Sequence, residues 1–157
     1  MTRPRIFAVA AVVLTGAMLG VPAVSASGSA APGDQKFVMI QTDPREEGGP
    51  IAATGPIHAK GVDVVTGEFK DRFEFPDGNV IIRHKPEGNG KDSFDPATCL
   101  FTFTERGSWK TVRGTRAYAN VQGSGTYKVL VQGFGCDENR PPETFFVRIV
   151  AKGPLAY

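Results

Sequence analysis

The stretch that decides the fold is residues 68–85, which read EFKDRFEFPDGNVIIRHK. Its first half alternates phenylalanine with charged residues, the period of a strand with one buried face. Residues 76–79, Pro-Asp-Gly-Asn, then supply a tight turn, because proline fixes φ and glycine tolerates positive φ. The stretch therefore predicts an antiparallel hairpin. On the first strand Phe69, Phe73 and Phe75 are expected to form the buried face. On the return strand Val80, Ile82 and His84 alternate with Ile81, Arg83 and Lys85, and the pattern does not show as clearly which of these two sets is buried.

The same two-residue period recurs along the chain from Lys36 onward. Clusters of Gly, Pro, Asn and Asp separate the alternating segments, and none of these segments has a convincing helical period. Two stretches, residues 86–97 and 135–142, lack the alternation and are expected to be loops. Eight strands are predicted near residues 36–42, 56–65, 68–75, 79–85, 99–105, 108–112, 121–134 and 143–152.

Strands with one apolar face predict an antiparallel sheet around a single core. With 157 residues, 19 of them glycine and 12 proline, the chain has room for one turn-rich domain and does not have the composition of a helical bundle. We predict an all-β fold with a single antiparallel barrel of about eight strands, because closure removes exposed sheet edges. A two-sheet β-sandwich is the alternative, since periodicity does not show closure.

The N-terminal segment has the pattern of an export signal. Arg3 and Arg5 precede an apolar run over residues 6–19, and Val24-Ser25-Ala26 supplies a small-residue cleavage site. We predict a cleaved Sec signal peptide over residues 1–26 and release into the extracellular space. A later cut within residues 29–31 and an uncleaved anchor are the alternatives. Residues 27–35 are expected to form a flexible leader, and residues 36–157 the barrel domain.

The net positive charge of the chain lies in the predicted export signal. The chain has 18 basic and 16 acidic residues, and both surplus arginines lie within residues 1–26. No run of Lys and Arg remains that would follow a phosphate backbone, so nucleic acid is not an expected partner.

Cys99 and Cys136 are the only cysteines. In an exported chain an even number of cysteines is usually paired, so a disulfide between them is predicted. Two free thiols, one of them a nucleophile, are the alternative, although no Cys-His pattern accompanies them.

Residues 109–127, WKTVRGTRAYANVQGSGTY, are the most distinctive part of the chain. They resemble the GTGxYxxxxGxG segment of the allene oxide cyclase-like and dirigent-like barrels, including secreted bacterial members with no assigned activity. Arg116 stands where that family more often has glycine, and the Pro-Asp-Gly-Asn turn also looks like the family's hairpin. The matching positions, interpreted as structural, are Gly114, Thr115, Tyr118, Gly123 and Gly125.

The resemblance implies a barrel whose lumen handles a small apolar molecule. Allene oxide cyclases are isomerases of a fatty-acid epoxide, and dirigent proteins steer the coupling of phenoxy radicals. Both activities rest on a shaped apolar cavity with a few polar groups. The matched motif is structural, so no catalytic residue is carried over from the family.

Three polar residues are in step with apolar faces and are therefore candidates to enter the lumen: Asp71, His84 and Glu105. A buried carboxylate near an imidazole could act as an acid or base with a raised pKa. The alternative is a strand end that reaches solvent or an ion pair with Arg83 or Arg148. The phenylalanines are interpreted as core rather than as a ligand cage, because they alternate with polar residues.

Other chemistries lack their signals. The two histidines, His58 and His84, and the two cysteines show no zinc-ligand spacing, and Asp92 and Asp95 lack the ligand series of an EF-hand. Gly123-Ser124-Gly125 does not have the spacing of a nucleophile elbow, and no Walker lysine follows the glycines. No metal or cofactor is expected. We expect a non-catalytic binding or interaction module, with an isomerase or coupling-steering protein as the alternative and the oligomeric state left open.

Overall fold

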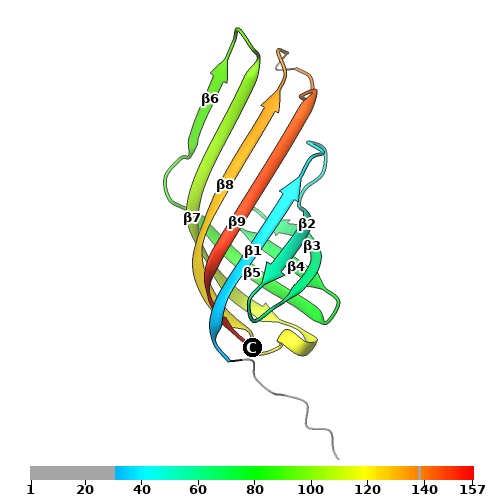
Figure 1. Cartoon of the computed structure of the whole chain (residues 1–157), viewed down its shortest axis with the longest axis vertical. Coiled ribbons are helices and arrows are strands. Elements are labelled where there is room, and N and C mark those ends of the chain that lie inside the picture. Colours follow the sequence, from blue (N-terminus) through cyan, green and yellow to red (C-terminus); the bar gives the residue numbers. More distant parts are fainter. Residues whose placement is uncertain (1–30, 138) are drawn as a thin grey trace, which may run out of the picture.

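The computed structural model describes residues 31–137 and 139–157 (Figure 1). The predicted signal peptide and residues 27–30 of the predicted leader lie outside these ranges. The described chain is almost entirely β-strand, so the predicted all-β class is confirmed. The strands are β1 (Gly33–Gln41), β2 (Gly49–Thr54), β3 (Ala59–Gly67), β4 (Lys70–Phe75), β5 (Gly78–Pro86), β6 (Lys91–Asp95), β7 (Leu100–Gly114), β8 (Gln122–Phe134) and β9 (Thr144–Ala156), with one 3₁₀ turn, η1 (Arg116–Tyr118).

Eight of these strands form a closed antiparallel ring. They follow one another in the order β5-β4-β3-β2-β1-β9-β8-β7, and β5 also pairs with β7, from Val80 opposite Gly114 to Pro86 opposite Gly107. This last pairing joins the two ends of the sheet, so the predicted single barrel is confirmed and the sandwich alternative is wrong. Closure leaves the ring without a free edge over the length of the β5–β7 pairing.

The ninth strand, β6, lies outside the ring. It pairs with the first part of β7, Leu100–Thr104, whereas β5 pairs with the second part, Gly107–Gly114. Both are antiparallel to β7, so β6 continues the direction of β5 along the same edge of β7. The chain between them, residues 87–90, contains two glycines with positive φ, Gly88 and Gly90.

The strand list departs from the sequence prediction at four places. Residues 99–105 and 108–112 are not two strands but parts of β7, which runs through the intervening Gly107. Strand β2 lies in a segment where no strand was predicted, and β6 lies inside the predicted loop 86–97. Strand β1 begins at Gly33, so three residues of the predicted leader belong to the barrel.

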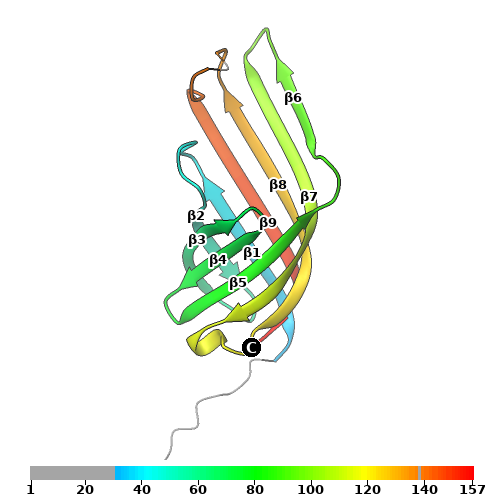
Figure 2. The same ribbon diagram turned by 180° about the vertical axis from the view of Figure 1, so that it is seen from behind.

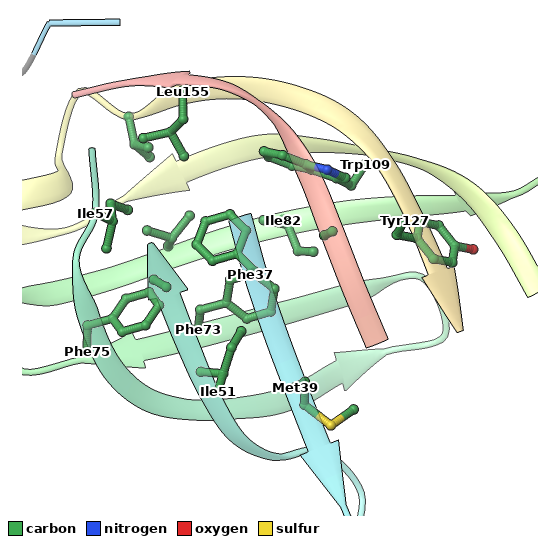
Figure 3. Close-up of a cluster of buried hydrophobic side chains, with 14 of the residues drawn as sticks. Phe37, Met39, Ile51, Ile57, Phe73, Phe75, Ile82, Trp109, Tyr127 and Leu155 are labelled. Carbon is green, nitrogen blue, oxygen red and sulfur yellow. The ribbon is translucent and has the colours of Figure 1, made fainter. Parts of the chain in front are cut away.

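The core fills one end of the barrel with aromatic and aliphatic side chains (Figure 3). The Phe37 ring lies 5.1 Å from that of Phe73 and 5.7 Å from that of Trp109, centre to centre. Phe73 and Phe75 are buried as the hairpin pattern predicted, but Phe69 is 42% exposed because it precedes β4 in the turn. On the return strand Val80 and Ile82 join this core.

A tall sheet rises from the other end of the barrel, made by the outer parts of β7, β8 and β9 together with β6 (Figures 1 and 2). The structure contains the predicted disulfide between Cys99, at the β6–β7 turn, and Cys136, in the β8–β9 loop. The backbone N–H of Gly135 also donates to the carbonyl of Cys99 at 3.0 Å. The disulfide therefore ties together two connections at the tip of this sheet.

The glycine-rich segment closes the filled end of the barrel. Tyr118, at the end of η1, is buried, and its ring meets those of Phe75 and Tyr157 edge-on at 6.0 Å and 5.0 Å. A Cβ at Gly114 would collide with the carbonyl oxygen of Tyr118, so only glycine permits this reversal. Arg116 has φ +52°, in the left-handed region, at the position where the resembling family more often has glycine.

Candidate functional site

The barrel encloses a cavity of about 300 Å³ beside its filled end. The floor of the cavity is apolar and consists of six buried side chains from five strands. At the mouth the lining includes two exposed residues, Val65 and Glu68, at the end of β3 and in the turn that follows. Cavities of this size and lining hold small apolar molecules. The floor residues are Phe37, Met39, Ile51, Phe73, Ile82 and Trp109.

All three predicted site residues line this cavity. Asp71 comes from β4, His84 from β5 and Glu105 from β7. The His84 Nε2 atom lies 3.4 Å from Asp71 Oδ2, a distance too long for a strong hydrogen bond. Glu105 accepts a 2.7 Å hydrogen bond from the hydroxyl of Tyr127, and the ring of Tyr127 meets that of His84 edge-on at 5.7 Å. The four side chains thus form a connected band around the cavity.

Glycine makes room for the aromatic member of this band. A Cβ at Gly107 would lie 2.6 Å from Cε1 of Tyr127 and would collide with the carbonyl oxygen of Lys85. The bare backbone of β7 at this point therefore lets the Tyr127 ring pack directly against the wall. Figure 3 shows Tyr127 at one end of the apolar cluster, with its hydroxyl pointing away from Phe37 and Trp109.

Asp63 is a further lining residue, which the sequence did not single out. It lies on β3, is 5% exposed, and faces the cavity beside Phe73, its partner on β4. Over the residues that the structure describes, its Oδ1 atom has no hydrogen-bond partner. Asp63 is not evident from the sequence because Val62 and Val64 flank it, and an alternating strand would be expected to direct these two valines into the barrel. In the structure Val62 is exposed and Asp63 is buried.

Burial and like charge shape the acidity of this site. Desolvation, reinforced by the nearby Asp71 carboxylate, raises the pKa of Asp63 from 3.8 to about 7. Desolvation also raises the pKa of Asp71, and the neighbouring His84 opposes that increase. The pKa of Tyr127 is raised strongly, first by desolvation and then by its hydrogen bond to Glu105.

The arrangement has room for a molecule with an apolar body and can exchange a proton with a polar group on it. Asp63 has a pKa near neutrality, which suits an acid or base, while the Tyr127 hydroxyl is held protonated. Both cysteines are in the disulfide, so neither can act as a nucleophile. Among the described residues, no cluster of three or more His, Cys, Asp or Glu side chains has the arrangement of a metal site.

The glycine-rich motif takes no part in this cavity. None of Gly114, Thr115, Tyr118, Gly123 and Gly125 lines it. Gly123 and Gly125 instead permit close packing of β8 on β9, where a Cβ at Gly125 would collide with the carbonyl oxygen of Lys152. The motif therefore builds the closed end and the wall of the barrel, and the candidate site lies elsewhere.

Fold and site together define an eight-stranded antiparallel β-barrel with a half-filled lumen. Comparison of the chain with protein-family models, with curated proteins and with solved structures finds no match. Within residues 31–137 and 139–157, no helix has the length and apolar character needed to cross a bilayer.

Proposed function

We propose that this chain is a secreted small β-barrel that acts as a non-catalytic binding module for a small hydrophobic ligand held in its lumen. The observation that carries the proposal is the cavity of about 300 Å³ over a floor of six buried apolar side chains. A barrel packed solidly by its phenylalanines would have no such space. Here Phe37 and Phe73 both pack in the core and line the cavity, so one set of rings serves both purposes.

Secretion and family membership are parts of the same proposal. The signal-like residues 1–26 supply the route, and the Cys99–Cys136 disulfide fits an oxidising compartment. The proposed family is that of the secreted bacterial allene oxide cyclase-like and dirigent-like barrels. Its support is the glycine-rich segment, in which Arg116 has the left-handed backbone conformation that explains a glycine at this position in relatives.

Ligand binding can be followed with a reporter that the chain already carries. Trp109 is the only tryptophan and lies on the cavity floor, so its fluorescence should respond to an occupant. We expect 2-phenylethanol, a small neutral aromatic probe, to change this fluorescence in a saturable way. Native mass spectrometry of protein purified from its own medium would then look for the natural occupant.

A matched pair of substitutions tests where the probe binds. Val129→Phe places a ring in the cavity from β8, whereas Val112→Phe makes the same change at a 51% exposed position of β7 that does not line it. We expect Val129→Phe to weaken binding by about tenfold or more and Val112→Phe to leave it unchanged. If Val129→Phe does not fold, Ile149→Phe makes the same test from β9. Equal binding by a folded cavity variant and the control would contradict the proposal.

A second candidate function is an isomerase or coupling-steering protein that uses the same lumen. The observation that favours it is the band of Asp71, His84, Tyr127 and Glu105 around the cavity, with Asp63 able to gain or lose a proton near pH 7. We expect such an enzyme to convert a fatty-acid epoxide, or to direct phenol coupling, at a rate that His84→Gln lowers. Binding without any conversion would decide for the binding module.

A further inference from the structure

The polar lining of the cavity has an unbalanced charge. Four carboxyl side chains line it, from β3, the β3–β4 turn, β4 and β7, and no Lys or Arg of the described chain does so. His84 is the only basic side chain in the lining. The carboxyl groups belong to Asp63, Glu68, Asp71 and Glu105.

Two of these carboxyl groups have a partner within the protein. Asp71 lies beside His84, at 3.4 Å, and Glu105 accepts the hydroxyl hydrogen of Tyr127 at 2.7 Å. Glu68 is exposed at the mouth, where water can solvate it. Asp63 differs from all three, because it is buried and its Oδ1 atom has no hydrogen-bond partner in the described chain.

A comparison with another buried polar residue shows how unusual Asp63 is for this fold. Gln35 is 1% exposed, yet its Nε2 donates to the carbonyls of Thr54 and Ile57 and its Oε1 accepts from the Ile57 N–H. Buried polar groups normally have such partners, because an unsatisfied one loses its hydrogen bonds to water without replacement. Asp63 lines an open cavity, so a partner for its carboxyl group can come from a bound molecule.

The charge of that partner follows from the surroundings of Asp63. Asp71, which lines the same cavity, is a carboxyl whose charge raises the pKa of Asp63, and a second negative charge disfavours an anionic occupant. A neutral occupant would leave the carboxylate uncompensated whenever it ionises. A cation would pair with Asp63 and lie within reach of the field of Asp71. A metal ion is not the cation that fits, because these groups do not converge into a ligand set.

We propose that the occupant of the lumen is a small organic ammonium ion, whose charged head lies against Asp63 and Asp71 and whose apolar body covers the aromatic floor. The inference rests on the proposed binding function and names its ligand class. The floor supplies the rings of Phe37, Phe73 and Trp109, which suit an aromatic or aliphatic body and attract a nearby cation through their π-faces. An amine with a small apolar body would thus contact both the carboxyl groups and the apolar floor of the cavity.

Proton linkage follows from this placement. The Asp63 carboxyl, which holds a proton up to about pH 7, must release it to pair with an ammonium ion. Affinity for the cation is therefore expected to rise between pH 6 and pH 8. The other titratable groups that face the site are Glu68, Asp71, His84, Glu105 and Tyr127, so the pH profile has to be compared between the wild type and Asp63→Asn.

Three probes with one body and different charges test the inference: 2-phenylethylammonium, 2-phenylethanol and phenylacetate, each titrated against Trp109 fluorescence of the disulfide-bonded protein at pH 8. A charge-assisted hydrogen bond to a buried carboxylate is worth about 1.5 kcal/mol or more, so the ammonium probe should bind about tenfold more tightly than the alcohol. Phenylacetate should bind more weakly than the alcohol. Millimolar Ca²⁺ should not displace the ammonium probe.

Asp63→Asn is the decisive variant, with Asp92→Asn, on the exposed β6, as the control that removes the same charge. We expect Asp63→Asn to abolish the preference for the ammonium probe and its rise with pH, while 2-phenylethanol still binds. Asp92→Asn should change neither. If 2-phenylethanol binds at least as tightly as the ammonium ion, or if Asp63→Asn keeps the preference, the ligand class is wrong and the binding function stands. If no probe binds, the binding function itself is wrong.

Discussion

Replacement of Asp63 by asparagine should stabilise the protein at neutral and alkaline pH. Asparagine keeps the shape of the side chain and removes its charge. The carboxyl of Asp63 is 5% exposed, and its Oδ1 has no hydrogen-bond partner in the described part of the chain. The folded protein therefore pays a desolvation penalty whenever this group ionises, and the variant does not.

The size and pH dependence of the effect follow from the pKa. In the unfolded chain the carboxyl ionises near its ordinary value of 3.8, and in the folded protein near 7. Between these values the folded protein keeps a proton on Asp63 that the unfolded chain has released. The contribution of Asp63 to the free energy of unfolding is therefore fully present below pH 3.8 and is lost as the pH rises to about 7. Three pKa units correspond to about 4 kcal/mol, which is the largest stabilisation expected of Asp63→Asn at pH 8.

Urea unfolding at pH 4 and pH 8 measures this difference directly, with Trp109 fluorescence and circular dichroism as probes. Several titratable side chains share the site, so only the difference between variant and wild type is compared at each pH. They are Glu68, Asp71, His84, Glu105 and Tyr127.

The control is Asp92→Asn, which removes a carboxyl from an exposed position of β6. It should not change the difference in stability between pH 4 and pH 8. The reasoning is refuted if Asp63→Asn is no more stable than the wild type at pH 8. It is also refuted if Asp63→Asn raises the free energy of unfolding by as much at pH 4 as at pH 8, because the increase at pH 4 would not come from ionisation of Asp63.

Three further predictions concern the scaffold. Gly125→Ala should destabilise the protein by about 2 kcal/mol or more, because its Cβ would collide with a β9 carbonyl. Gly67→Ala, whose Cβ would make only an ordinary contact with Lys70 Cβ at 3.9 Å, should stay within about 0.5 kcal/mol in urea unfolding. The double change Cys99→Ser with Cys136→Ser opens a crosslink between residues 37 apart in sequence, and should lower the unfolding free energy by about 4 kcal/mol in the chain-entropy description; an unchanged urea midpoint under non-reducing conditions would contradict it. Arg116→Gly places glycine at a position with left-handed backbone conformation and should raise the free energy of unfolding by about 0.5 kcal/mol, seen as a small rise in Tm. A fall in Tm would contradict the expectation that Arg116 is strained.

The hairpin and the barrel were predictable because their signals are local. The alternation over residues 68–75 and the Pro-Asp-Gly-Asn turn fix a strand, a reversal and a buried face, and Phe73 and Phe75 are buried as expected. Strands β2 and β6 were missed because their sequences, GPIAAT and KDSFD, have small or charged residues in place of alternating large apolar ones. Their strand conformation comes from pairing with β1 and β7, which is a tertiary effect.

The candidate site was predictable in part. Asp71, His84 and Glu105 were found because each is in step with an apolar face, and strand periodicity then places it in the lumen. Asp63 was not found, because the valines on either side of it suggest the opposite orientation of β3. The cavity itself was not predictable, since its volume depends on how side chains from all eight strands of the ring pack together.

Nuclear Overhauser effects between a bound probe and the protein test most directly whether the lumen is a binding site. With 2-phenylethylammonium at pH 8, we predict contacts from the probe's ring protons to the Trp109 indole and the Phe73 ring, both on the cavity floor. Saturable binding that gave contacts only to outward-facing side chains such as Val112, or no saturable binding of either this probe or 2-phenylethanol, would contradict a binding site in the lumen.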